Sequence, residues 1–241
     1  MDFAEQNQIA SHSVLEHWYY QAKFELLRRT LSAFGILRPG TQLADLGCGL
    51  GVFLTLLEKR RLLSPGQMIG IDPAAQSGQH SIGGTVPIAT AWPDKGFDLI
   101  LLMDVLEHIE DDRAALAQAW TQLKPGGYAF ITVPAFSFLW SHHDEVLGHC
   151  RRYTMGSLEN LLQTIPDLKV KRLHYFYALI FPIAMVVRRA RRKTRDAASD
   201  LKPAPPWLNL LLKKSLSLES LFARHNKIAG LTVVALVQKQ G

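Results

Sequence analysis

The sequence predicts an α/β fold in which a mainly parallel sheet is covered by helices on both faces. The run Phe97–Met103 is almost continuously apolar, which is typical of a central parallel strand buried on both sides. The glycine turn Gly47-Cys48-Gly49-Leu50-Gly51 links an apolar strand to a segment of helical period. Five short strands alternate with helical segments, at 41–46, 67–72, 86–90, 97–103 and 128–133.

The remaining elements follow from periodicity and from turn residues. Apolar residues at helical spacing predict one helix over 12–34, and the glycine turn leads into a second helix that ends near 61. Further helices are expected after Pro73, over 104–123 and over 154–162. Strands are expected at 168–175 and 231–237, with a mostly helical or loose segment at 188–230 between them.

A chain of 241 residues suits one domain with its own core. We divide it into a helical cap (1–40), a ligand-binding core (41–175), an apolar and basic helical insertion (176–230) and a last strand (231–241).

Cysteine content and charge limit the compartment and the partners. Cys48 and Cys150 are too few for a disulfide framework, and residues 1–6 show no signal-peptide pattern, so we expect a cytoplasmic location. The formal net charge of +6 is uneven, because residues 188–241 hold 12 of the 27 Lys and Arg residues but only 3 of the 21 acidic ones. The uneven charge indicates a near-neutral globular part and a basic C-terminal segment at 188–241. A nucleic-acid partner is therefore not expected.

The glycine turn indicates a nucleotide-like ligand. A dinucleotide fingerprint places glycines at positions one, three and six, whereas the sixth residue counted from Gly47 is Val52. The glycines here occupy positions one, three and five. Asp72 ends the next strand, where its carboxylate could accept both hydroxyl groups of a ribose.

At these motifs the sequence resembles the class I S-adenosylmethionine-dependent methyltransferases. The resemblance rests on Asp45–Gly51, Ile69–Asp72, Phe97–Ile109 and Leu123–Gly127, which occur in the family's order. It implies a Rossmann-like sheet of seven strands with the last strand antiparallel. It also implies S-adenosyl-L-methionine as cofactor and S-adenosyl-L-homocysteine as product.

The resemblance implies a set of cofactor-binding residues. The glycine turn would run alongside the amino-acid portion of the cofactor, and Asp45 would lie beneath that portion. Asp72 would bind the ribose of the cofactor. Other members of the set would contact the adenine or line the far side of the site. The full set is Asp45, Gly47, Cys48, Gly49, Asp72, Pro73, Trp92, Met103 and Asp104.

Two further segments, His17–Tyr20 and Gly148–Thr154, resemble a bacterial branch of this family that occurs in glycan, lipid and secondary-metabolite pathways. Trp18 and Tyr19 then form either a core-facing stripe or a lid over the ligand, and we include them with His143 among the substrate-binding candidates.

Methyl transfer requires close alignment of donor and acceptor, together with a base where the acceptor is a hydroxyl group. The histidine candidates are His108, His142, His143 and His149, of which His149 is preferred; Tyr153 is a further catalytic candidate. Arg151 and Arg152 either clamp an anionic or glycan substrate or pair with carboxylates and order the loop.

The pattern Asp104-x-x-Glu107-His108 raises the question of a metal. It resembles the Glu-x-x-Glu-His motif of metal-assisted O-methyltransferases that act on ubiquinone precursors or small-RNA ends. The first acid here is Asp, and relatives without a metal also carry this pattern. The sequence therefore predicts no metal.

The run 176–187 is apolar but shorter than the ~20 residues of a spanning helix, and arginines follow it directly. The segment 207–214 repeats the apolar-then-basic pattern. Residues 176–214 therefore form either a peripheral contact with an anionic membrane, which would place the protein on the inner membrane surface, or an apolar lid over the active site.

The predicted function is methyl transfer from S-adenosylmethionine to a small-molecule, lipid or glycan acceptor, with oxygen favoured over nitrogen or carbon. One alternative is RNA methylation, although the basic segment lacks interleaved aromatic residues that would stack on bases. The other alternative is a non-catalytic module that binds S-adenosylmethionine.

Overall fold

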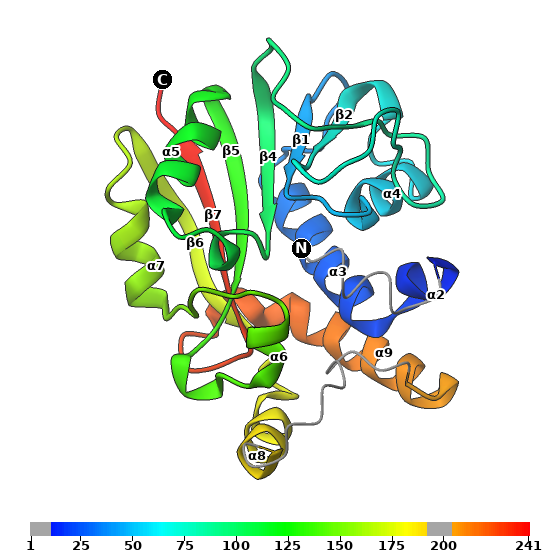
Figure 1. Ribbon diagram of the computed structural model, residues 1–241, viewed down its shortest axis with the longest axis vertical. Helices are drawn as coiled ribbons and strands as arrows, with labels where there is room; N and C mark the ends of the chain where they lie inside the picture. The colour runs from blue at the N-terminus through cyan, green and yellow to red at the C-terminus, as the bar shows by residue number, and fades with distance from the viewer. Residues whose placement is uncertain (1–10, 192–203) are drawn as a thin grey trace.

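A seven-stranded sheet in the order β3-β2-β1-β4-β5-β7-β6 forms the centre of the computed structural model, which describes residues 11–191 and 204–241 (Figure 1). The five strands from β3 to β5 are parallel, and β7 lies antiparallel between β5 and β6. The predicted α/β fold is confirmed, including the antiparallel last strand. The strands are β1 Leu43–Leu46, β2 Met68–Ile71, β3 Ile88–Ala89, β4 Phe97–Met103, β5 Leu123–Pro134, β6 Leu168–Phe176 and β7 Thr232–Lys239.

Helices cover both faces of the sheet, with α3 and α4 on one side and α5 and α7 on the other (Figure 1). Alternate residues of β4 enter the two layers, because Leu99 and Leu101 pack on one side while Ile100 and Leu102 pack on the other. The helices are α2 Ser11–Glu16, α3 Trp18–Ala33, α4 Val52–Lys59, α5 Asp112–Thr121, α6 His142–Val146, α7 Met155–Leu162, α8 Phe181–Arg191 and α9 Pro206–Phe222. Short 3-10 helices are η1 Pro65–Gln67, η2 Leu106–His108, η3 Ser137–Leu139 and η4 Ala223–His225.

The single helix predicted over 12–34 is wrong, because the chain breaks at His17. This residue has an extended backbone, and its side chain accepts a hydrogen bond from the N–H of Tyr19 at 3.3 Å. The side chain of Asn209 in α9 accepts a second bond, from the N–H of Trp18, at 2.8 Å. A tertiary partner far along the chain thus stabilises the start of α3, which local periodicity could not indicate.

Two other predicted helices also differ. No helix follows Pro73, since the described chain between β2 and β3 forms turns, the first of which is closed by a bond from the N–H of Ala74 to Asp72 Oδ1. The helix predicted over 104–123 divides into η2 and α5, because Asp104 has a φ of 55° and Asp111 caps α5 through the N–H of Ala114.

The parallel strands end near η2, and the helices α6, α8 and α9 lie beyond that end of the sheet (Figure 1). Open α/β sheets bind ligands at the carboxyl ends of their strands. This end of the molecule therefore holds the candidate site.

Candidate active site

The glycine turn follows β1 and needs its glycines. Gly47, Gly49 and Gly51 have φ values of 62°, 55° and 71°, which favour glycine. A Cβ at Gly47 would lie 2.8 Å from Val105 Cγ2, so a side chain there would also collide with the chain after β4. The backbone is thereby free to approach a ligand closely.

Asp72 ties the glycine turn to the end of β2. Its Oδ2 accepts a hydrogen bond from the N–H of Gly49 at 2.8 Å, and its Oδ1 accepts one from Ala74 at 2.9 Å. The residue is buried, and each carboxylate oxygen retains a further lone pair. Ribose binding by Asp72 stays a prediction that these contacts allow.

Asp45 is a buried carboxylate whose two oxygens have no hydrogen-bond partner among the described residues. Burial, reinforced by the charge of Asp72, raises its pKa to about 7. A buried acid without a partner is costly in a protein, and such a group suits a site that receives a cation. This observation fits the ammonium group of S-adenosylmethionine.

The other predicted cofactor-binding residues differ in how far their side chains are exposed to solvent. The Cys48 thiol is buried, which raises its pKa, so this residue would contribute its backbone only. Met103 is buried at the end of β4, and Pro73 is exposed. The half-buried ring of Trp92 lies 5.9 Å from the ring of Phe97.

Side chains from α3 and from β5 contact the Asp104 carboxylate. The ammonium group of Lys23 in α3 pairs with Asp104 Oδ2, which also accepts from the Tyr19 hydroxyl at 3.1 Å. The Thr132 hydroxyl donates to Oδ1 at 3.1 Å. Burial would raise the pKa of Asp104, but the charge of Lys23 outweighs it and lowers the pKa.

A pocket of about 520 Å³ lies beside Asp104. Its walls come from α3, η2, the segment around α6, α8 and α9. Seven of the predicted site residues line it, namely Trp18, Tyr19, Asp104, His108, His143, His149 and Arg152. Trp18 and Tyr19 are half-buried rather than core residues, and Tyr19 stacks on Tyr177 at 5.4 Å.

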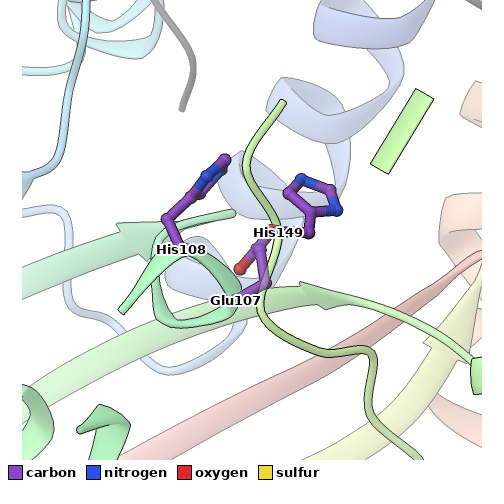
Figure 2. Close-up of side chains that lie close together, drawn as sticks. All are labelled: Glu107, His108 and His149. Carbon is purple, nitrogen blue, oxygen red and sulfur yellow. The ribbon is translucent and has the colours of Figure 1, made fainter. Parts of the chain in front are cut away.

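Glu107, His108 and His149 form a cluster on the pocket wall (Figure 2). One ligand atom from each lies within 4.8 Å of the others. The carboxylate oxygens of Glu107 are buried without a hydrogen-bond partner among the described residues. Burial, together with the charge of Asp104, raises the Glu107 pKa to about 8. Two imidazoles and a carboxylate at this spacing could hold a divalent cation.

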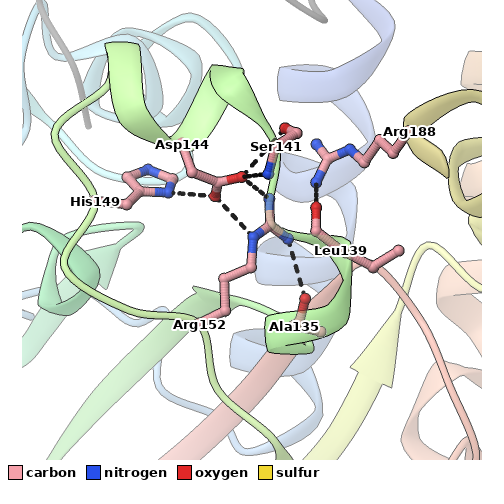
Figure 3. A network of polar contacts seen from close by, with 7 residues as sticks. All are labelled: Ala135, Leu139, Ser141, Asp144, His149, Arg152 and Arg188. Carbon is pink, nitrogen blue, oxygen red and sulfur yellow. Dashed lines mark hydrogen bonds and ion pairs between the residues drawn. The ribbon is translucent and has the colours of Figure 1, made fainter. Parts of the chain in front are cut away.

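A buried network fixes His149 from behind (Figure 3). Asp144 Oδ1 lies 2.8 Å from His149 Nδ1, and Arg152 donates to both Asp144 oxygens at 2.7 and 3.0 Å. Arg152 also donates to the carbonyl oxygen of Ala135 at 3.0 Å. Burial would raise the pKa of Asp144, but its bonds with His149 and Arg152 hold that pKa well below its usual range.

Arg151 and Tyr153 do not line the pocket. Arg151 pairs with Asp112 Oδ2 at 2.7 Å and donates to the carbonyl oxygen of Glu110 at 2.7 Å. The buried Tyr153 hydroxyl donates to the same Asp112 oxygen at 2.7 Å, and burial raises its pKa. With Arg152 bound to Asp144, these contacts match the alternative in which the arginines pair with carboxylates and order the loop.

Sequence reasoning missed Lys23 and Asp144. Lys23 was detectable as a lone lysine on the apolar face of the predicted first helix, where burial demands an anionic partner. Asp144 carried only the signal of a helix cap, three residues after Ser141, and nothing linked it to His149.

The sheet order, the glycine turn and the acid at the end of β2 are those of the class I S-adenosylmethionine-dependent methyltransferases, as the motifs predicted. A family model described as a methyltransferase domain matches residues 15–165, and the chain belongs to this family.

Curated relatives match less than half of the chain. A ubiquinone biosynthesis O-methyltransferase from Bradyrhizobium sp. is 31% identical in an alignment 121 residues long, and the match covers 46% of this chain and 45% of that protein. A phosphoethanolamine N-methyltransferase from Triticum aestivum is 29% identical over 105 residues, 40% of this chain and 21% of that protein. The chain thus spans less than half the length of these relatives.

A solved structure extends the likeness over nearly the whole chain. The plantazolicin methyltransferase BpumL, in complex with a monoazolic desmethyl analogue and S-adenosylhomocysteine, covers 98% of this chain and 87% of its own, with a TM-score of 0.58. The identity is 16%, so the likeness concerns the fold.

Proposed function

We propose that this protein transfers the methyl group of S-adenosylmethionine to an oxygen atom of a small-molecule acceptor. The observation that carries the proposal is the pocket beside Asp104, whose wall presents Glu107, His108 and His149 at the carboxyl end of the sheet. The ubiquinone biosynthesis O-methyltransferases among its relatives support oxygen as the acceptor atom.

The cofactor would supply the activated methyl group, and the chain would bind and orient it. The glycine turn would let the backbone approach the amino-acid portion closely, and Asp45 would offer its carboxylate, which has no hydrogen-bond partner among the described residues, to the ammonium group. Asp72 would bind the ribose. Fixed alignment of donor and acceptor is worth ~7–11 kcal/mol of the barrier, so much of the catalysis would come from this positioning.

The acceptor hydroxyl must lose its proton, and the cluster on the pocket wall suits that task. His149 would act as the base, or a divalent cation held by Glu107, His108 and His149 would favour the deprotonated hydroxyl. The sequence predicted no metal. We now propose one, because the buried and unpartnered Glu107 carboxylate supports it.

The acceptor that we propose is amphiphilic and reaches the pocket from an anionic membrane surface. The pocket walls include the apolar residues Ile183 and Val187 of α8 and Leu212 of α9. The same helices expose Val186, Leu211 and other large apolar side chains to solvent. A membrane contact and an active-site lid are thus compatible roles for these helices.

Charge supports the same surface. Arg189 in α8 and Lys214 in α9 are exposed next to these apolar residues, as an anionic lipid surface would require. Residues 192–203 of the predicted contact segment lie outside the described residues. Within the described part of the chain, every helix is too short or too polar to cross a membrane.

Transfer of labelled methyl from S-adenosylmethionine to phenolic and catechol acceptors, with and without an isoprenoid chain, tests the proposed activity. We expect turnover that is lost in His149→Ala. Methyl transfer only to nitrogen acceptors would contradict the proposal. So would the absence of any transfer when the acceptors are offered together with lipid vesicles.

A further inference from the structure

We propose that Asp144 and Arg152 are positioning residues, which hold His149 in the tautomer that carries its proton on Nδ1 and leaves the lone pair on Nε2. The inference deepens the proposed function, on which it rests for its catalytic consequence. The tautomer itself can be measured without any turnover.

Hydrogen-bond chemistry sets the direction of the contact between Asp144 and His149. Asp144 Oδ1 lies 2.8 Å from His149 Nδ1, and the same carboxylate accepts bonds from Arg152 and from the N–H of Ser141. The two bonds from the Arg152 guanidinium are those of a bidentate ion pair with a carboxylate, and a carboxylate can only accept hydrogen bonds. His149 Nδ1 must therefore donate, and in the neutral imidazole this places the lone pair on Nε2.

Burial shields the contact between Asp144 and His149 from water. The side chains of Asp144 and Arg152 are 0% and 3% exposed, and that of His149 is 7% exposed, so solvent has little access to replace the bonds. Arg152 donates in addition to the carbonyl oxygen of Ala135, directly after β5 (Figure 3). The network thus anchors the imidazole to the sheet and not only to its own loop.

The other side of the imidazole adjoins Glu107 and His108. The rings of His108 and His149 meet edge to face with centroids 4.7 Å apart, and Glu107, the neighbour of His108 in η2, lies beside them (Figure 2). A lone pair on Nε2 serves this cluster either as a proton acceptor or as a metal ligand. Partners behind a ligating or catalytic histidine act in this way elsewhere, by fixing its tautomer and orientation.

The network also gives Arg152 a definite role. With both of its Asp144 contacts in place, the guanidinium balances a buried negative charge that would otherwise be costly. It therefore serves His149 through Asp144 and not by clamping the acceptor.

The ¹⁵N NMR spectrum of the imidazole groups tests the tautomer directly. The His149 signals are assigned by their loss in His149→Gln. In the wild type without cofactor, at an alkaline pH where the tautomer of the neutral ring is observed, we expect a protonated Nδ1 and an unprotonated Nε2; the reverse pattern would overturn the proposal, whatever the variants do.

Asp144→Asn extends the test. Arg152 should bind the amide oxygen and turn the amide NH₂ group toward His149, so that the proton moves to Nε2. An unchanged tautomer in this variant would overturn the proposal. Arg151→Gln is the matched control, because Arg151 binds Asp112 outside the network. In this variant His149 should keep the wild-type tautomer.

A turnover assay separates this inference from the proposed function. Asp144→Asn should lower kcat about 10- to 100-fold with little change in the KM for S-adenosylmethionine. If Asp144→Asn shows the reversed His149 tautomer but keeps full activity, the positioning role of Asp144 stands and His149 is removed from the proposed mechanism. A wild type with the expected tautomer but no turnover would count against the proposed function alone.

Discussion

The Lys23 ammonium group is completely buried and pairs with the Asp104 carboxylate at the carboxyl end of β4. Asp104 adopts a positive φ of 55°, and it also accepts hydrogen bonds from the Tyr19 and Thr132 hydroxyls. The pair therefore connects α3 with the sheet at the edge of the pocket. The Asp104 side of this pair also lines the pocket.

We predict that Lys23→Met destabilises the fold strongly, because Asp104 would keep a buried charge without its partner. The expected loss is about 3–5 kcal/mol in the free energy of unfolding, measured by urea denaturation. Lys124→Met is the control, since Lys124 and Asp98 form a half-exposed pair worth about 0–1 kcal/mol. Equal losses in the two variants would refute a special role for the Lys23 pair.

Asp45→Asn should stabilise the cofactor-free protein and weaken cofactor binding. The raised pKa means that the fold disfavours the ionised carboxyl, so the wild type loses stability as the pH rises from about 4 through 7. At pH 8 the variant should gain about 1–3 kcal/mol of unfolding free energy, and this gain should vanish near pH 4. Its affinity for S-adenosylmethionine should fall about tenfold; a variant that is both less stable and equally tight would contradict this account.

His174 should make the fold less stable in mild acid. Burial lowers its pKa to about 4, whereas an unfolded histidine titrates near 6.5, so the unfolded chain binds more protons between these values. Stability is therefore present above about pH 6.5 and falls by up to about 3 kcal/mol as the pH drops to 4. Urea titrations at pH 7 and pH 5 should show a smaller difference in His174→Gln than in the wild type; identical differences would show that His174 does not contribute.

Metal removal should lower activity if the cluster holds a cation. Dialysis against EDTA should reduce turnover at least tenfold, and Mg²⁺, Mn²⁺ or Zn²⁺ should restore it. Glu107→Gln should abolish the restoration, because the variant lacks the carboxylate ligand. Turnover that survives EDTA unchanged would eliminate the cation and leave His149 as the base.

Anionic liposomes should carry the protein upward in a flotation gradient. The double variant Val186→Glu, Leu211→Glu should no longer float. Both side chains are exposed on the protein, and burial of each in the membrane would contribute about 1.5–3 kcal/mol to the binding free energy. Neither residue lines the pocket. Ile228→Glu is the matched control, since Ile228 is 88% exposed but lies outside α8 and α9. A wild-type protein that stays at the bottom would remove the membrane proposal.

The sheet was predictable because its signals are local. The apolar run of β4, the glycine turn and the acid that ends β2 all lie within short stretches of sequence, and each occupies the predicted place. The antiparallel last strand came from the family resemblance and not from the β-branched run itself.

The errors arose where distant residues decide the local structure. Asn209 binds the N–H of Trp18, directly after the break at His17, from 191 positions away, and Lys23 reaches Asp104 across 81 positions. Arg152 is close to Asp144 in the sequence, yet their bond depends on how the irregular loop between them folds. No spacing rule along the chain could indicate these partners.

Calorimetric titration with S-adenosylmethionine tests the central claim most directly. The account predicts one binding site per chain, competition by S-adenosylhomocysteine, and at least tenfold weaker binding by Asp72→Ala, which lacks the ribose contacts and the support of Gly49. No binding of S-adenosylmethionine by the wild type, or an unchanged affinity in Asp72→Ala, would contradict it.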